Sequence, residues 1–482
     1  MHRYLLTTVA AVVLTAGAAL AQGEGEFPAT LAGHAVMPAE SFVDAPADAP
    51  VDLKTSGKYT TGKRIDAIGT VMGKSYERAT GVSLPFKGQP LQGHSGIKKM
   101  ADGTFWVLTD NGMGSRYNSS DSMLYLNHYK IDWSTGKVER LETIFLHDPE
   151  RKVPFRIIHE DTARRYLTGA DFDTEGFQII GDNLWIGDEF GPYIIKADKG
   201  GKVLAVFETV ADGKPVRSPD HWAVQSPGAP GATYSNVNLR RSKGFEGFAS
   251  SVDGKFIYGL LEGPLWDGEK KEWEKVDGKE ASRILEFDVA AEKFTGRYWQ
   301  YAFEQNGNAI GDFNMIDPSQ GLVIERDNGE GTSDKACPQG VRGENCFPDV
   351  AKFKRVYKIE LSDANVGKPV RKIAYIDLMK IKDPDKKARK PLNDGVLTFP
   401  FFTIENVDRV DDTHIIVGND NNLPFSSSRE PNKADDDEFV LLEFADFLKA
   451  KERHVACSRR RAESLSRSTA DRRQIKPFAP SP

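Results

Sequence analysis

The chain has 482 residues, of which 39% are hydrophobic and 28% are charged, so it can bury a sizeable core. The formal net charge is −6, and residues 451–482 hold nine Lys/Arg against three Asp/Glu, so the rest of the chain is more acidic still. An acidic body excludes nucleic acid as a partner and is compatible with cation binding.

The N-terminus has the pattern of a secretory signal. His2 and Arg3 precede an apolar run over 4–20, and Ala19 and Ala21 mark a cleavage site after Ala21. Because the run is about as long as a membrane span, an uncleaved anchor is the alternative. No later segment is apolar enough to cross a bilayer. We therefore predict a periplasmic or secreted protein, with a signal peptide over 1–21 and no transmembrane span in the mature chain.

The flanks of the chain read as poorly structured. Residues 22–58 are rich in Ala, Pro, Gly and acid without sustained periodicity, so we predict a linker before a domain that spans 59–450. Residues 63–72 form one isolated strand pattern inside that domain. The basic tail, 451–482, has no apolar period, which predicts disorder.

Five hairpins of one layout recur along the domain. Alternation and turn chemistry give each a polar start, a strand, a turn, a second strand and an acidic exit, over 95–110, 175–188, 246–262, 312–325 and 405–420. Two further strand patterns follow each of the first four hairpins, but only one follows the fifth.

Repeated units of four strands predict an all-β protein, a β-propeller of four-stranded blades around a central channel. An N-terminal strand can complete the last blade, and we assign 63–72 to that role. The units start 66 to 93 residues apart, which leaves room for a hidden blade. Five blades are visible in the sequence, and five to seven are compatible with its length.

The acidic hairpin ends are the chief candidate site. A hairpin returns to the end where it began, so all five starts and exits should meet at one mouth of the channel. The carboxylates expected there as metal ligands are Asp110, Glu175, Asp188, Glu189, Glu246, Glu262, Glu325, Glu405 and Asp420. Crowded like charges need compensation, and hard cations supply it, above all Ca²⁺, with another divalent metal as the alternative. Individual acids could instead close turns by accepting backbone N–H bonds.

Polar residues near the same mouth suit a small anionic ester as substrate. Arg326 follows Glu325 directly, and Arg116 follows Asp110 by six residues. Arginine binds phosphate bidentately, although a salt bridge to a neighbouring carboxylate is an equal alternative for Arg326. The side chains of Asn421 and Asn422 would lie alongside.

Two local patterns carry separate expectations. Residues 171–182 resemble a calcium loop, but strand-like flanks disfavour an EF-hand. Cys337 and Cys346 lie nine residues apart with no nearby His, so a local disulfide is favoured over a zinc site.

The chain resembles the family called esterase-like activity of phytase, or phytase-like domain proteins. The resemblance spans about 63–450 and rests on five stretches, HSGIKKMADGTFWVLTDNG, DTEGFQIIGDNLWIGDEFGP, KGFEGFASSVDGKFIYGLLEG, GLVIERDNG and TIENVDRVDDTHIIVGNDNN. It implies a secreted or periplasmic β-propeller that hydrolyses phosphate or other esters.

The residues and the resemblance together favour a metal-dependent hydrolase of phosphate esters. A carboxylate, Glu405 or Glu175, would take the proton of a metal-bound water. One alternative is a carboxyl-ester hydrolase or lactonase that uses the same metal. Another is a non-catalytic propeller that calcium only stabilises and that binds a ligand. We expect a monomer in each case.

Overall fold

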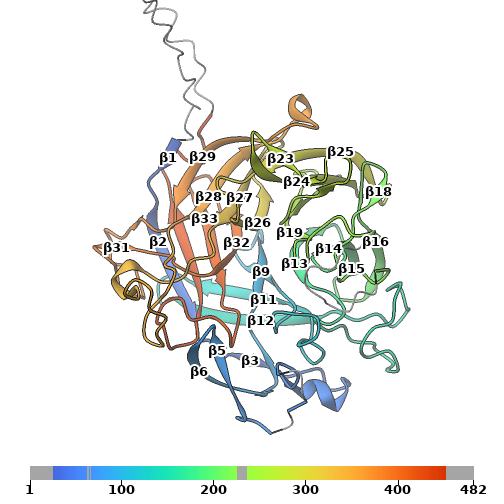
Figure 1. Cartoon of the computed structure of the whole chain (residues 1–482), viewed down its shortest axis with the longest axis horizontal. Coiled ribbons are helices and arrows are strands. Elements are labelled where there is room, and N and C mark those ends of the chain that lie inside the picture. Colours follow the sequence, from blue (N-terminus) through green and yellow to red (C-terminus); the bar gives the residue numbers. More distant parts are fainter. Residues whose placement is uncertain (1–24, 62–63, 66, 225–235, 452–482) are drawn as a thin grey trace, which may run out of the picture.

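The computed structural model describes residues 25–61, 64–65, 67–224 and 236–451. Within these residues there is no α-helix, and nearly all regular structure is β-strand. Five sheets stand around a common axis, which makes the protein a five-bladed β-propeller (Figure 1). The expected fold class is therefore confirmed. The predicted signal peptide and residues 452–482 of the tail lie outside the described residues.

The first four blades are each built from strands in chain order, the first strand lying innermost. Blade one contains β9 (His94–Lys99), β10 (Phe105–Thr109), β11 (Tyr125–Asp132) and β12 (Lys137–Phe145). Blade two contains β13 (Thr174–Ile180), β14 (Asn183–Asp188), β15 (Tyr193–Asp198) and β16 (Val203–Glu208). Blade three contains β19 (Phe245–Ser250), β20 (Phe256–Leu261), β24 (Lys279–Asp288) and β25 (Lys293–Ala302). Blade four contains β26 (Ala309–Met315), β27 (Gln320–Arg326), β28 (Lys354–Glu360) and β29 (Arg371–Asp377).

The fifth blade joins the two ends of the chain. It contains β32 (Thr403–Arg409), β33 (His414–Asp420), β34 (Asp437–Glu443) and, as its fourth strand, β2 (Thr30–Met37). β2 runs antiparallel to β34, from Thr30 opposite Glu443 to Met37 opposite Asp437. An N-terminal strand thus closes the ring, as predicted.

The identity of the closing strand was predicted wrongly. Residues 63–72 do not close the ring, since β5 begins only at Val71 and pairs with β6 outside the blades. The segment 22–58, expected to be a linker, supplies β2 instead. Its small residues fit a crowded position, because Gly33 lies against the Trp133 ring and His34 is fully buried beside Glu438. Only two of its eight residues, Thr30 and Val36, are β-branched, so its composition is not typical of a strand.

Short elements decorate the blades and their loops. They are β1 (Gly25–Phe27), β3 (Phe42–Val43), η1 (Val51–Lys54), β4 (Thr55–Ser56), β5 (Val71–Ser75), β6 (Arg78–Leu84), β7 (Phe86–Lys87), β8 (Gln89–Pro90), β17 (Val210–Ala211), β18 (Lys214–Pro215), β21 (Trp266–Asp267), β22 (Glu272–Trp273), β23 (Lys275–Val276), η2 (Ser333–Lys335), η3 (Asp363–Asn365), β30 (Ile381–Lys382) and β31 (Val396–Leu397). Cys337 and Cys346 form a disulfide in the loop between β27 and β28, with their Cα atoms 4.8 Å apart.

The core is divided among the blade interfaces. Five apolar clusters each fill the gap between two adjacent blades, and a sixth lies under residues 39–86. Near the axis the inner strands approach so closely that only glycine fits at several points. A Cβ on Gly176 would collide with Phe248, and one on Gly247 would lie 2.7 Å from the Cβ of Phe313. In the fifth blade Asn406 takes the corresponding place, and its Nδ2 donates to His94 O at 2.7 Å across the ring closure.

Substituting Gly176 with alanine is expected to destabilise the protein by about 1–3 kcal/mol, because the added methyl group overpacks the contact with Phe248. Denaturant unfolding measures this loss. The matched control is Gly268→Ala, where an added Cβ meets no atom within 4 Å and the change should stay within about 0.5 kcal/mol. Equal stability of the two variants would contradict the close packing of the inner strands.

Candidate metal centre

The five inner strands share a β-bulge at the same level. Each has one residue more than the second strand of its blade at that point. A bulge redirects the side chain that it carries. The first bulge residues are Ser95, Glu175, Glu246, Gly311 and Glu405. Three blades therefore each direct a glutamate to one level of the channel.

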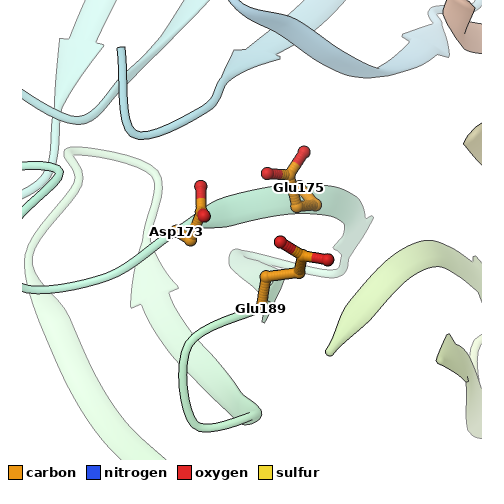
Figure 2. A group of neighbouring side chains, drawn as sticks. All are labelled: Asp173, Glu175 and Glu189. Carbon is orange, nitrogen blue, oxygen red and sulfur yellow. The ribbon is translucent and has the colours of Figure 1, made fainter. Parts of the chain in front are cut away.

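Six carboxylates meet at this level, and we call them the carboxylate cluster. They form three overlapping groups in which ligand oxygens lie within 4.8 Å of one another: Asp173, Glu175 and Glu189; Glu175, Glu246 and Glu405; Glu189, Glu246 and Glu262. All six are only 2% to 7% exposed. Figure 2 shows the first group: Asp173 just before β13, Glu175 on β13 and Glu189 just after β14, with their carboxylates close together.

Backbone hydrogen bonds hold the acids that lie outside the strands. Glu189 follows β14, and its N–H donates to Asp173 O at 2.8 Å. Glu262 follows β20, and its N–H donates to Gly244 O at 2.8 Å. The cluster thus rests on the rigid ends of blade strands, which fixes the positions of its oxygens.

Burial raises the pKa of these carboxyls, and their mutual repulsion raises it further. The pKa values of Glu175, Glu189 and Glu246 lie well above the usual range for glutamate, first from desolvation and then from neighbouring carboxylates. The pKa of Asp173 rises to about 6, chiefly by desolvation. The cluster therefore resists full ionisation unless a positive charge enters it.

Two basic side chains contact the cluster. Arg326 Nη2 lies 3.1 Å from Glu405 Oε1, and Lys243 Nζ contacts Glu262 Oε2. Burial alone would lower the pKa of Arg326, but Glu405, Glu262 and Glu246 outweigh it and raise that pKa. Two cations facing six carboxylates leave four without a counter-charge. Consistent with this deficit, the buried Oε1 of Glu189 accepts no hydrogen bond from any residue that the structure describes.

Below the cluster the channel is filled by polar side chains. Asp312 accepts from the N–H groups of Ile97 and Val407 at 3.3 and 3.1 Å. Asn314 Oδ1 accepts from Gln178 Nε2 at 2.8 Å and from Lys98 Nζ at 3.0 Å. These contacts close the axis, so the carboxylate cluster belongs to one mouth of the propeller only.

Of the nine predicted metal ligands, the structure brings five together in the cluster: Glu175, Glu189, Glu246, Glu262 and Glu405. Asp110 and Asp420 lie at its edge, and each accepts a backbone N–H two residues ahead, from Gly112 at 2.7 Å and Asn422 at 2.6 Å. Desolvation, with Asp173 and Glu405, raises the pKa of Asp110 to about 8. Asp188 accepts from the N–H groups of Asp173 and Gly191, at 2.8 and 2.7 Å, and so closes a turn.

The ninth residue, Glu325, lies outside the cluster. Its Oε2 accepts from Tyr301 Oη at 2.9 Å and pairs with Lys372 Nζ at 2.8 Å. Neighbouring strand residues point to opposite faces, and so Arg326 reaches the cluster while Glu325 does not. The structure therefore does not bring Glu325 together with the other predicted ligands.

The other predicted binding residues have structural partners. Arg116 donates to Ala170 O at 3.0 Å and to Asp220 O at 2.7 Å. Asn421 Nδ2 donates to Asp435 O at 3.2 Å, and Asn422 Nδ2 donates to Thr403 Oγ1 at 2.5 Å. Of the four residues proposed for substrate binding, only Arg326 contacts the cluster.

Two cluster contacts were missed by sequence reasoning. Asp173 was considered only within the calcium-loop pattern of 171–182, and Lys243 carried no signal beyond its place ahead of Glu246. The acids at the two ends of that pattern have other partners. Asp171 accepts from the N–H groups of Ile158 and Thr168, and exposed Asp182 pairs with Lys199. The useful signal for Asp173 was its spacing of two residues from Glu175.

A sequence profile of the phytase-like family, described as esterase-like activity of phytase, matches residues 89–423, which is more than half of the chain. The chain belongs to the phytase-like family. In this phytase-like protein, the matched range contains all six cluster residues, Arg326 and Lys243. It ends before β34, so the strands that complete the fifth blade lie beyond it.

Other similarities are weaker. An uncharacterised secreted protein of Arthroderma benhamiae is 30% identical over 145 residues, and the match covers 26% of each chain. Glutaminyl cyclase of Myxococcus xanthus aligns over 74% of this chain and 92% of its own, at 9% identity and a TM-score of 0.31. A luciferin-regenerating enzyme aligns over 75% and 97%, also at 9% identity and 0.31. Similarities this low carry no argument about function.

Among the described residues no helix is long and apolar enough to span a membrane.

Proposed function

We propose that this phytase-like protein is a secreted or periplasmic, calcium-dependent hydrolase of phosphate esters. The observation that carries the proposal is the carboxylate cluster, in which three overlapping groups of acids share ligand oxygens within 4.8 Å. Family membership supports hydrolase activity in general. The phosphate ester and the calcium ion are inferred from the chemistry of the cluster.

The donor set suits a hard cation. All six side chains offer carboxylate oxygens, and none offers the nitrogen or sulfur that zinc and copper prefer. Calcium accepts six to eight oxygen ligands in flexible geometry, which fits acids contributed by three blades. The unpaired Oε1 of Glu189 is a buried acceptor that such an ion would satisfy.

A bound calcium ion would supply a Lewis acid that offsets phosphate charge and acidifies a water molecule. Glu405 is well placed to take a proton, because Arg326 holds one of its oxygens and Ser95 Oγ donates to the other at 2.8 Å. Glu175 belongs to two of the three groups and we assign it chiefly as a ligand. The guanidinium of Arg326, whose Nε has no hydrogen-bond partner among the described residues, can orient an anionic substrate.

Turnover of 4-nitrophenyl phosphate with and without calcium tests the proposal. We expect phosphate release from the calcium-loaded protein, loss of activity in EDTA and recovery when calcium is restored. Turnover that persists in EDTA would reject the mechanism. Turnover of 4-nitrophenyl acetate alone would favour a carboxyl-ester hydrolase or lactonase. Calcium that raises the Tm without any ester turnover would favour a non-catalytic binding propeller.

A further inference from the structure

A cleft with a volume of about 550 Å³ opens beside the carboxylate cluster and has no part in the site described above. Three loops line it: the loop after β10, the loop before β13 and the loop before β19. These loops connect to the strand ends that carry Asp110, Glu175 and Glu246. The cleft therefore lies on the same mouth of the propeller as the cluster.

Contacts of Arg116 place the cleft close to the cluster. Arg116 Nε donates to Ala170 O at 3.0 Å, and Ala170 precedes Asp173 by only three residues. Three residues of extended chain span at most roughly 11 Å. On the other side, Asp220 pairs with Arg241, which is two residues from Lys243 at the cluster. Two contacts of the cleft lining therefore lie within a few residues of the cluster along the chain.

The cleft is cationic although the protein as a whole is acidic. Arg116 donates to two neutral carbonyl oxygens and forms no ion pair among the described residues, although its charge acts on the buried Asp171 carboxyl. Exposed Arg156 has no ion-pair partner among the described residues. Asp220 is the acid in the lining, and its carboxylate is engaged by Arg241. Guanidinium groups that form no ion pair favour an anionic ligand in a cleft.

Aromatic side chains line the same cleft. Tyr117 is 61% exposed and Trp222 is 41% exposed, which is unusual for such large apolar groups. Phe155 is held in place by ring contacts with Phe172 and Tyr193, at 5.3 and 5.8 Å between centroids. Exposed rings beside a rigid aromatic floor offer stacking surfaces for a planar ring.

We infer that this cleft binds a planar ring bearing an anionic group, with the ring against Tyr117 and Trp222 and the anion on Arg116 and Arg156. As a binding site it is independent of the proposed function.

Calorimetric titration of the calcium-loaded full chain with phenylphosphonate, which is not hydrolysed, tests the inference. Arg156→Gln and Trp222→Ala are each expected to raise the Kd roughly tenfold, through loss of a charged hydrogen bond and of a stacking surface. Arg342→Gln changes an exposed arginine elsewhere and should leave the Kd unchanged. Methylphosphonate, which lacks the ring, should bind more weakly than phenylphosphonate and should not respond to Trp222→Ala.

Unchanged phenylphosphonate binding in both cleft variants would overturn the inference, as would equal affinity for the two phosphonates. Because Arg156 is exposed, Arg156→Gln keeps the test valid even if Trp222→Ala folds poorly. The two proposals fail separately. Binding as expected without hydrolysis of any ester would support the cleft proposal and contradict the hydrolase proposal. A chain that hydrolyses phenyl phosphate but binds phenylphosphonate equally well in both variants retains the hydrolase proposal and contradicts the cleft proposal.

Discussion

Glu405→Gln is expected to lower kcat for an aryl phosphate by about 10²–10⁴-fold, the usual contribution of a general base. The amide keeps the shape of the side chain and can still accept from Arg326 or Ser95, but it can no longer take a proton. Loss of its charge also weakens calcium binding, so kcat must be measured at saturating calcium. Steady-state assays with 4-nitrophenyl phosphate, together with a calcium titration, separate the two effects.

Glu325→Gln is the matched control for this experiment. Glu325 is also buried and also forms a buried ion pair, but its partner is Lys372 and it lies outside the cluster. The control should lose stability, since breaking a buried pair costs about 3–5 kcal/mol, and yet retain kcat and calcium affinity. If Glu405→Gln kept full kcat at saturating calcium, Glu405 would not be the base.

The blades could be predicted because their evidence is local in sequence. Each hairpin places two alternating strands and their turn within about 15 residues, and the five copies support one another. The closing strand could not be predicted in this way. β2 pairs with a strand that lies about 400 residues away in the sequence. Its residues TLAGHAVM include Gly33, which packs against Trp133, and His34, which pairs with Glu438.

The sequence predicted which blades contribute to the candidate site, but not which side chains at the hairpin exits face it. Glu175, Glu246 and Glu405 were found because they start hairpins, and the structure places each of them at a shared bulge. At the exits, however, a shift by one residue reverses the direction of the side chain. Asp188 therefore closes a turn while Glu189 enters the cluster, and Glu325 leaves it while Arg326 enters.

Removing calcium is expected to make the stability of the protein fall as pH rises from about 5 to about 8. In the metal-free fold the pKa values of Asp173 and Asp110, about 6 and about 8, exceed the ordinary value of 3.8. Between the unfolded and folded pKa values the native state therefore binds more protons than the unfolded state. By linkage, stability is greatest at low pH and is lost as pH rises through the folded pKa.

A calcium ion bound as proposed would replace those protons as the counter-charge, so the loaded protein should show little change over the same interval. We expect the Tm of EDTA-treated protein to drop by roughly 5–10 °C between about pH 5.5 and about pH 8, in contrast to the loaded form. Glu246→Gln removes one repelling charge, and so the metal-free variant should lose less Tm than the metal-free parent while it binds calcium more weakly. An ion that neutralises the carboxylates must make the Tm of the protein less dependent on pH. If the Tm fell equally with pH in the presence and absence of calcium, the carboxylates would instead be neutralised by groups of the protein itself.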